Sequence, residues 1–222
     1  MNFYLLELIG KWLIFLLASF ASIFNLIGNN ESDIVTEVVA YKTIKNYDSS
    51  IPSNIQTVTV EGKDGLVYTN ELGEVVVLEE VIDEQITIGT GKDGNYTGIM
   101  TGYGPDCYTC SGEGYVACRT REKKDFNIIT DGLYYNDIEF GESRVLAAAL
   151  SEFPCGTIVE VESKVLGTFT GIVLDTGYDM RKHLGMGIYH FDVAYSTEKD
   201  EMVPKTTDMS GTVKYNVQRW GW

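Results

Sequence analysis

The pattern of hydrophobic positions changes near residue 30. Residues 12–28 read WLIFLLASFASIFNLIG, an apolar run without a charged residue. Counted from Tyr4, the run reaches the roughly 20 residues that a membrane-spanning helix needs. No apolar–polar periodicity marks a solvent-facing side, which disfavours the alternative of a helix buried in the core of a soluble domain. We therefore predict an N-terminal transmembrane helix within residues 1–30.

Two interpretations of this segment remain open. It is an uncleaved anchor, or a signal peptide with a permissive cleavage site at residues 19–21. We favour the anchor, because apolar residues continue through Ile27. Lys11 precedes the run and polar residues 29–33 follow it, so the positive-inside rule places the bulk of the chain outside. We expect a single-pass cell-membrane protein with its bulk extracellular, or a secreted protein if the segment is cleaved.

After residue 33 the pattern is that of short strands separated by glycine-rich turns. Residues 62–65, GKDG, stand between extended segments 57–60 and 66–68 and predict a hairpin. The same tetrad at residues 91–94 marks a domain boundary near residue 93. The strands predicted beyond it are 96–103, 133–135, 144–148, 157–162, 168–174, 190–195 and 213–220. In the last of these, positions 213, 215, 217 and 219 are expected on one side and 214, 216, 218 and 220 on the other. Many short strands with glycine turns are typical of a small closed barrel.

Charge and composition narrow the possible functions. The 222 residues include 17 Lys and Arg and 32 Asp and Glu, a net charge of −15. Because residues 1–30 contain only Glu7 and Lys11, the remainder carries all of it. A surface with this much negative charge repels the phosphate backbones of nucleic acids, so we expect no nucleic-acid partner. The 44% hydrophobic content supplies enough apolar surface for a core and excludes a disordered acidic tail.

Residues 33–92 carry an ordered set of short motifs. These are EV at 37–38, YKT at 41–43, YDSSIP at 47–52, VEGKDG at 60–65, EEVI at 79–82 and IGT at 88–90. Together they resemble the G-five domain, a small all-β module of bacterial surface proteins. The resemblance implies binding to wall polysaccharide. The stretch 66–77 is shorter than in the family, so a β spacer without sugar binding stays an alternative.

A second set of motifs follows in the rest of the chain. It comprises MTGYGPDC at 100–107, CSG at 110–112, RVLAA at 144–148, FPCGTIV at 153–159, IVLDTG at 172–177 and FDV at 191–193. This set resembles the three-aspartate domain of stationary-phase-survival proteins, which is related to membrane-bound lytic transglycosylase A. The resemblance implies a six-stranded double-psi β-barrel. We therefore expect a mainly β chain: an anchor or signal peptide (1–30), a G-five-like β module (31–93) and the barrel (94–222).

The second resemblance also implies an activity. Its relatives cleave the bond between N-acetylmuramic acid and N-acetylglucosamine in peptidoglycan and leave a 1,6-anhydro ring. Here Asp192 would be the acid/base and Asp175 the second carboxylate. The glycan strand would contact Thr176, Gly177 and the rings of Tyr103 and Tyr178. We expect an enzyme that acts on peptidoglycan glycan strands without a cofactor or metal.

Two departures from the family pattern fall at this site. The first of the three aspartates is replaced by Ala149, and residues 178–187 make the loop between Asp175 and Asp192 longer. Glu152 could replace the missing acid if its loop bends back. The alternative function is a catalytically inactive surface barrel that binds peptidoglycan or another carbohydrate.

The cysteines and histidines offer further chemistry. Disulfides are favoured over free thiols or a metal site, and three pairings are possible among Cys107, Cys110, Cys118 and Cys155. A Cys155–His190 hydrolase dyad is disfavoured, because Cys155 occupies a turn of the family pattern. We expect His190 and Asp192 to point to opposite faces of their strand.

Overall fold

The structure is a computed structural model that describes residues 35–108 and 110–222. The predicted membrane segment lies outside these residues. No helix within the described ranges is long and apolar enough to cross a membrane. The described chain divides into two units, one of residues 35–38 and 66–78 and the other of residues 39–65 and 79–222.

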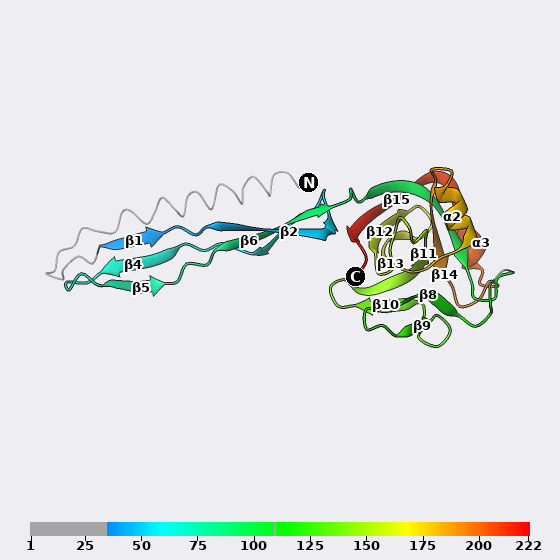
Figure 1. The fold of residues 1–222 in the computed structure, drawn as a ribbon, viewed down its shortest axis with the longest axis horizontal. Coiled ribbons are helices and arrows are strands. Elements are labelled where there is room, and N and C mark those ends of the chain that lie inside the picture. Colours follow the sequence, from blue (N-terminus) through cyan, green and yellow to red (C-terminus); the bar gives the residue numbers. More distant parts are fainter. Residues whose placement is uncertain (1–34, 109) are drawn as a thin grey trace, which may run out of the picture. The chain divides into compact units, whose positions relative to one another are not determined.

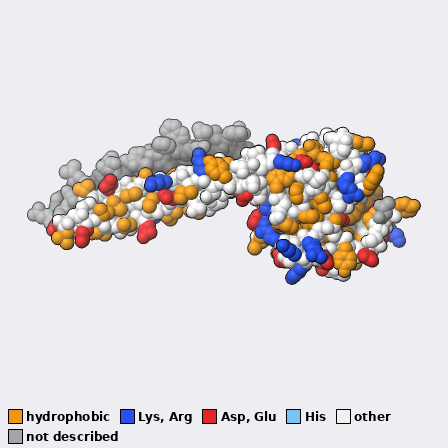
Figure 2. Space-filling model, viewed as in Figure 1, with side chains coloured by type: hydrophobic (Ala, Val, Ile, Leu, Met, Phe, Trp, Pro, Cys, Tyr) orange, Lys and Arg blue, Asp and Glu red, His pale blue; other side chains and the backbone are white. Residues whose placement is uncertain are grey.

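A three-stranded sheet contains the residues of the smaller unit. Its strands are β1 (Thr36–Val39), β4 (Gly65–Thr69) and β5 (Val75–Glu79), in the order β1-β4-β5. Asn70 closes the turn between β4 and β5 by accepting the backbone N–H groups of Leu72 and Glu74. Hydrophobic side chains along these strands reach the surface (Figure 2), and none of the apolar side chains described in these three strands is buried.

A second three-stranded sheet joins β2 (Thr43–Pro52), β6 (Glu84–Gly91) and β3 (Gln56–Val60). β6 lies between the others, parallel to β2 and antiparallel to β3. The hairpin predicted around residues 62–65 is therefore wrong, since β3 and β4 belong to different sheets. Lys63 instead pairs with Ile82, and Asp64 accepts the backbone N–H of Tyr41.

Six of the remaining strands form a closed mixed barrel (Figure 1). Around the barrel they follow the order β11-β13-β12-β15-β7-β14 and return to β11. β11 runs parallel to β13 and β14 runs parallel to β7, whereas the other neighbours are antiparallel. The bounds are β7 (Asn95–Tyr103), β11 (Gly141–Ala147), β12 (Ile158–Ser163), β13 (Gly167–Asp175), β14 (Tyr189–Ala194) and β15 (Asp208–Arg219). The prediction of a mainly β chain with a six-stranded barrel is confirmed.

Smaller elements surround the barrel. β10 (Tyr134–Asp137) extends the sheet at β11, and β8 (Tyr115–Arg119) pairs with β9 (Asp125–Asn127). Helix α2 (Tyr178–Leu184) packs against β14, and α3 (Met202–Thr206) packs against β7. One disulfide joins Cys107 to Cys110, and the other joins Cys118 of β8 to Cys155 in the turn before β12. The second one attaches the β8–β9 hairpin to the barrel.

Buried apolar side chains lie on both faces of the barrel strands. Chain neighbours such as Leu146 and Val145 fall in different clusters, because successive strand residues point to opposite faces. The β8–β9 hairpin contributes Cys118 and Phe126 to the second cluster. The rings of Phe153 and Tyr215 contact that of Phe191, with centroid distances of 4.6 and 4.2 Å. The alternation predicted for β15 is confirmed, because positions 213, 215, 217 and 219 are buried. At the last of these, the Arg219 guanidinium forms a buried ion pair with Asp137 at 2.7 Å.

Candidate functional site

The two aspartates of the second resemblance lie on either side of β11. Ala147, the last residue of β11, is in register with Asp175 of β13 on one side and with Asp192 of β14 on the other. The register of β11 and β13 shifts between Leu146 and Ala147, just before this pairing. Repulsion from Asp175 contributes to raising the pKa of Asp192, so the fold brings two acids that are 17 positions apart in the sequence near each other.

Asp175 is held by three hydrogen bonds. Its Oδ1 accepts the backbone N–H groups of Thr176, at 2.9 Å, and Ala117, at 3.0 Å. Its Oδ2 accepts the hydroxyl of Tyr103 at 2.8 Å. Burial raises the pKa of this carboxyl above its ordinary value, although the three hydrogen bonds act against the shift. Because Ala117 belongs to β8, Asp175 also fixes the β8–β9 hairpin against the barrel.

Asp192 is the more strongly perturbed of the two acids. Burial is the largest cause that raises its pKa from 3.8 to about 7. Repulsion from Glu198, Asp175 and Asp179 adds to the shift, while the hydrogen bond from Thr101 opposes it. That bond runs from Thr101 Oγ1 to Asp192 Oδ1 at 2.8 Å. A carboxyl group with this pKa can both give and take a proton near neutral pH.

Two histidines extend the hydrogen-bond network beyond Thr101. His190 Nε2 lies 2.8 Å from Thr101 Oγ1, and His190 Nδ1 lies 3.0 Å from His183 Nδ1. The expectation that His190 and Asp192 point to opposite faces is wrong. Residues two apart on a strand share a face, and here both contact the same threonine hydroxyl. Burial and the neighbouring His183 lower the pKa of His190 to about 4.

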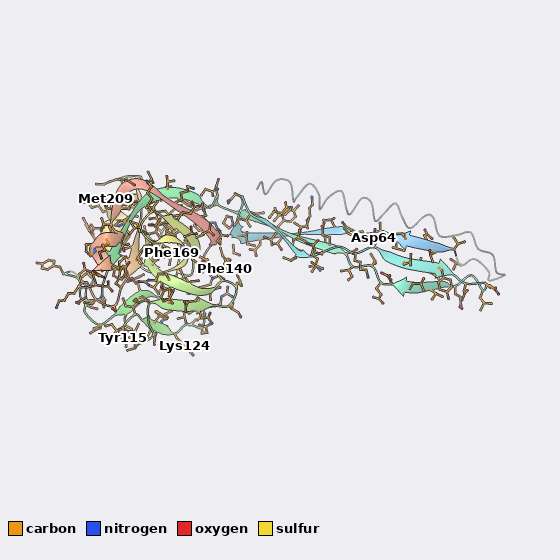
Figure 3. The ribbon with its side chains drawn as sticks, turned by 180° about the vertical axis from the view of Figure 1, so that it is seen from behind. Asp64, Tyr115, Lys124, Phe140, Phe169 and Met209 are labelled. Carbon is orange, nitrogen blue, oxygen red and sulfur yellow. A yellow bond between two sulfur atoms is a disulfide. The ribbon has the colours of Figure 1, made fainter. Side chains whose placement is uncertain are left out.

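A hollow of about 360 Å³ opens beside Asp175. Its wall includes all four residues predicted to contact substrate, namely Tyr103, Thr176, Gly177 and Tyr178. The β8 side contributes Tyr115 (Figure 3), and α2 contributes Arg181. The ring of Tyr178 is 71% exposed and free to stack on a ligand. Asp192 is not among the residues that line this hollow.

The structure supplies no acid at the position of the missing aspartate. Ala149 is buried in a small apolar cluster with Ala147 and Met180. Glu152 does not replace it, because its carboxylate accepts the Tyr96 hydroxyl at 3.1 Å and pairs with Lys92 at 3.3 Å. The acids that do act on Asp192 are those named above, on β13, on α2 and beyond β14.

No protein-family model, no curated protein and no solved structure matches this chain.

The barrel topology is compatible with the double-psi barrel that the motifs predict. The cysteine alternatives are resolved by the two disulfides, which leave no free cysteine within residues 35–108 and 110–222. The Cys155–His190 dyad is thereby excluded, since Cys155 is bonded to Cys118. In the same ranges, no group of three or more His, Cys, Asp or Glu side chains is arranged to hold a metal ion.

Sequence reasoning missed several members of the site. Thr101 and His190 each stand two positions from a residue singled out in the motifs, Tyr103 and Asp192. Strand periodicity would have placed each of them on the same face as its neighbour. Glu198 carried no comparable signal, because it lies beyond β14 in a segment without periodicity.

Proposed function

We propose that this chain is a cell-wall-lytic enzyme, a peptidoglycan lytic transglycosylase in which Asp192 is the single acid/base. The observation that carries the proposal is the buried Asp192 carboxyl, whose pKa is raised to about 7 and whose Oδ1 is held by Thr101. A general acid must be protonated at working pH and still able to lose its proton. An ordinary exposed aspartate, with a pKa near 4, would be almost fully ionised at pH 7.

The reaction needs one group in two consecutive roles. Protonated Asp192 gives its proton to the oxygen that links N-acetylmuramic acid to the next N-acetylglucosamine, and the bond from C1 to that oxygen breaks. The 6-hydroxyl of the muramic acid then bonds to C1, and its proton returns to Asp192. The products are a 1,6-anhydro end and a free 4-hydroxyl, so no water is consumed. An ordinary glycosidase would instead need a carboxylate pair and water.

Asp175 and the hollow beside it have a binding role in this proposal. Asp175 is already engaged by three donors, so it serves as a fixed negative charge that helps to keep Asp192 protonated. The exposed ring of Tyr178 and the ring of Tyr115 offer apolar faces to pyranose rings. Thr176 and Gly177 complete the floor of the subsite.

The rest of the chain fits the same proposal. Residues 94–222 would be a three-aspartate double-psi barrel, and residues 31–93 a G-five-like module that binds wall glycan or acts as a spacer. Residues 1–30 would anchor the protein to the membrane, with the barrel facing the wall. These assignments rest on the motifs and on the apolar run described above.

A binding barrel without catalysis is the second candidate. Two observations favour it: Ala149 sits where the family has an acid, and Asp192 does not line the hollow. Such a protein would hold glycan against Tyr103 and Tyr178 without cleaving it.

Product analysis distinguishes the candidates. The full chain is incubated with purified peptidoglycan, and the soluble products are identified by mass spectrometry. Anhydro-muropeptides support the proposal, whereas reducing-end products identify a hydrolase and contradict it. An absence of products from folded protein that still sediments with the wall supports the binding barrel.

A further inference from the structure

A continuous chain of hydrogen bonds connects α2 to the proposed acid. It runs from His183 Nδ1 to His190 Nδ1 over 3.0 Å, from His190 Nε2 to Thr101 Oγ1 over 2.8 Å, and from Thr101 Oγ1 to Asp192 Oδ1 over 2.8 Å. The four side chains come from α2, β14, β7 and β14 again. Nothing in the transglycosylase reaction described above requires the two histidines.

When Asp192 is ionised, the available donors and acceptors determine which group donates in each of these hydrogen bonds. A carboxylate only accepts, so the Thr101 hydroxyl must donate to Asp192. The hydroxyl then accepts from His190, which places the proton of neutral His190 on Nε2. His190 Nδ1 is consequently an acceptor and takes its hydrogen bond from the Nδ1–H of His183. The direction of each hydrogen bond determines that of the next, because a neutral imidazole has one donor and one acceptor nitrogen.

We propose that His183 and His190 are positioning residues, which orient the Thr101 hydroxyl toward Asp192 Oδ1 and so reserve Oδ2 for the proton that Asp192 exchanges with substrate. This inference rests on the proposed function. Without His190 the hydroxyl of Thr101 could rotate away from Asp192. Without His183, His190 could carry its proton on Nδ1 and accept from Thr101, which would reverse the chain.

The surroundings keep the histidine pair from taking up two protons. Two imidazolium rings would present two N–H groups to each other across the 3.0 Å contact. His190 is also buried, with 5% of its surface exposed, so its charged form is disfavoured. Because His190 stays neutral in the pH range where Asp192 is ionised, the direction of these hydrogen bonds is kept there.

Several charged or titratable groups face this network and must be held constant in any test. Asp179 on α2 favours a proton on His190 and disfavours ionisation of Asp192. The others that interact electrostatically with Asp192 are Asp175 of β13, Glu198 beyond β14, Tyr103 of β7 and Tyr215 of β15. None of the substitutions proposed below changes these five residues.

The first test does not require turnover. The tautomer of His190 is read from imidazole ¹⁵N shifts in the full chain, and the titration of Asp192 is followed by its ¹³C carboxyl signal. We expect the proton of His190 on Nε2. In His190→Leu we expect the midpoint of Asp192 to rise by about half to one pH unit, because its carboxylate loses a polarised donor. In the control His190→Gln, whose amide can donate to Thr101, we expect the midpoint of the parent.

Variants of His183 provide a second route if His190→Leu does not fold. His183 is only half-buried, so its substitution is tolerated more easily. His183→Ala should shift part of His190 to the Nδ1 tautomer, and His183→Asn, which retains a donor, should restore the parent state. The proposal is overturned if parent His190 carries its proton on Nδ1. It is overturned as well if Asp192 titrates identically in the parent and in every folded histidine variant.

Activity adds an independent readout. Because protonated Asp192 is the acid, the cleavage rate should fall as pH rises through the pKa of Asp192. His190→Leu should raise the pH at which the rate falls by the same amount as it raises the ¹³C midpoint. If no variant or parent cleaves peptidoglycan but the NMR results hold, the proposed function fails and the positioning inference stands as a statement about Asp192. If cleavage occurs and the rate falls at the same pH in His190→Leu and His190→Gln, the positioning inference fails and the proposed function stands.

Discussion

Asp175 and Asp192 lie opposite the same residue, Ala147, from the two strands that flank β11. They nevertheless differ in environment. Asp175 receives three hydrogen bonds, whereas Asp192 receives one, from Thr101. The three donors favour the anion of Asp175 more than the single donor favours that of Asp192, and such a difference between neighbouring carboxyl groups is a recurrent way to separate an acid from a fixed charge.

The raised pKa of Asp192 has a consequence for stability. Its folded pKa of about 7 exceeds its unfolded value of 3.8, so the folded state binds the extra proton between these limits. The stability that this proton provides is complete below pH 4 and is lost as pH rises through 7. Asp192→Asn removes the dependence. Relative to the parent, the variant should gain about 2–4 kcal/mol in free energy of unfolding between pH 4 and pH 8.

Chemical denaturation at both pH values measures this difference. Asp125→Asn is the matched control, because Asp125 is exposed and its ion pair with Arg119 is at the surface. The interpretation fails if Asp192→Asn and the control respond equally to pH.

Ala149→Asp tests whether restoring the aspartate of the family pattern increases the cleavage rate. Ala149 is 3% exposed and contacts an apolar cluster, so the new carboxyl would be buried without a partner. We expect a loss of about 2–4 kcal/mol in free energy of unfolding and no gain in cleavage rate. Ala149→Val, which adds volume without charge, is the control. A stable and more active Ala149→Asp protein would show that this pocket still accommodates the acid.

The two disulfides should differ in their effect on stability. Cys118–Cys155 closes a loop of 37 residues between two parts of the core, whereas Cys107–Cys110 spans three residues. The chain-entropy model gives about 3–4 kcal/mol for the former and less for the latter. Thermal unfolding of the double-alanine variant of each pair measures the difference. Equal destabilisation by the two variants would contradict this account.

Tyr178 provides a test of the hollow. Its ring is largely exposed, so Tyr178→Ala should leave the melting temperature unchanged. If sugar stacks on this ring, the variant should lose about fivefold in kcat/KM or in affinity for soluble glycan fragments, because stacking contributes roughly 1 kcal/mol. Tyr178→Phe should retain most of the activity. An unchanged affinity in Tyr178→Ala would place the glycan elsewhere.

Local patterns in the sequence predicted the barrel strands better than their partners. The alternation from Val213 to Arg219 is correct because every second residue of this part of β15 is buried, whereas residues 208–212 are not. β8 and β9 were missed because they are short and their pairing is irregular. The hairpin at residues 62–65 was wrong for another reason: Lys63 pairs with Ile82, a partner that no local turn signal specifies.

The residues of the site could likewise be predicted only in part from local sequence patterns. Asp175 and Asp192 could be named from motifs, but Thr101 meets Asp192 only through the parallel register of β7 and β14. His183 reaches His190 because α2 packs on β14, which depends on tertiary structure. The two-residue period of a strand could have placed His190 and Asp192 on one face, whereas the burial that raises the pKa of Asp192 depends on tertiary packing around β14.

The most direct test of the account compares initial rates of anhydro-muropeptide formation by the parent, Asp192→Asn and the exposed control Asp125→Asn, all as full chains. We expect Asp125→Asn to match the rate of the parent and Asp192→Asn, which cannot exchange a proton, to be slower by at least about 10²-fold. We also expect Asp192→Asn to remain folded and to sediment with the wall. Anhydro product formed by Asp192→Asn at the rate of the parent would contradict the central claim.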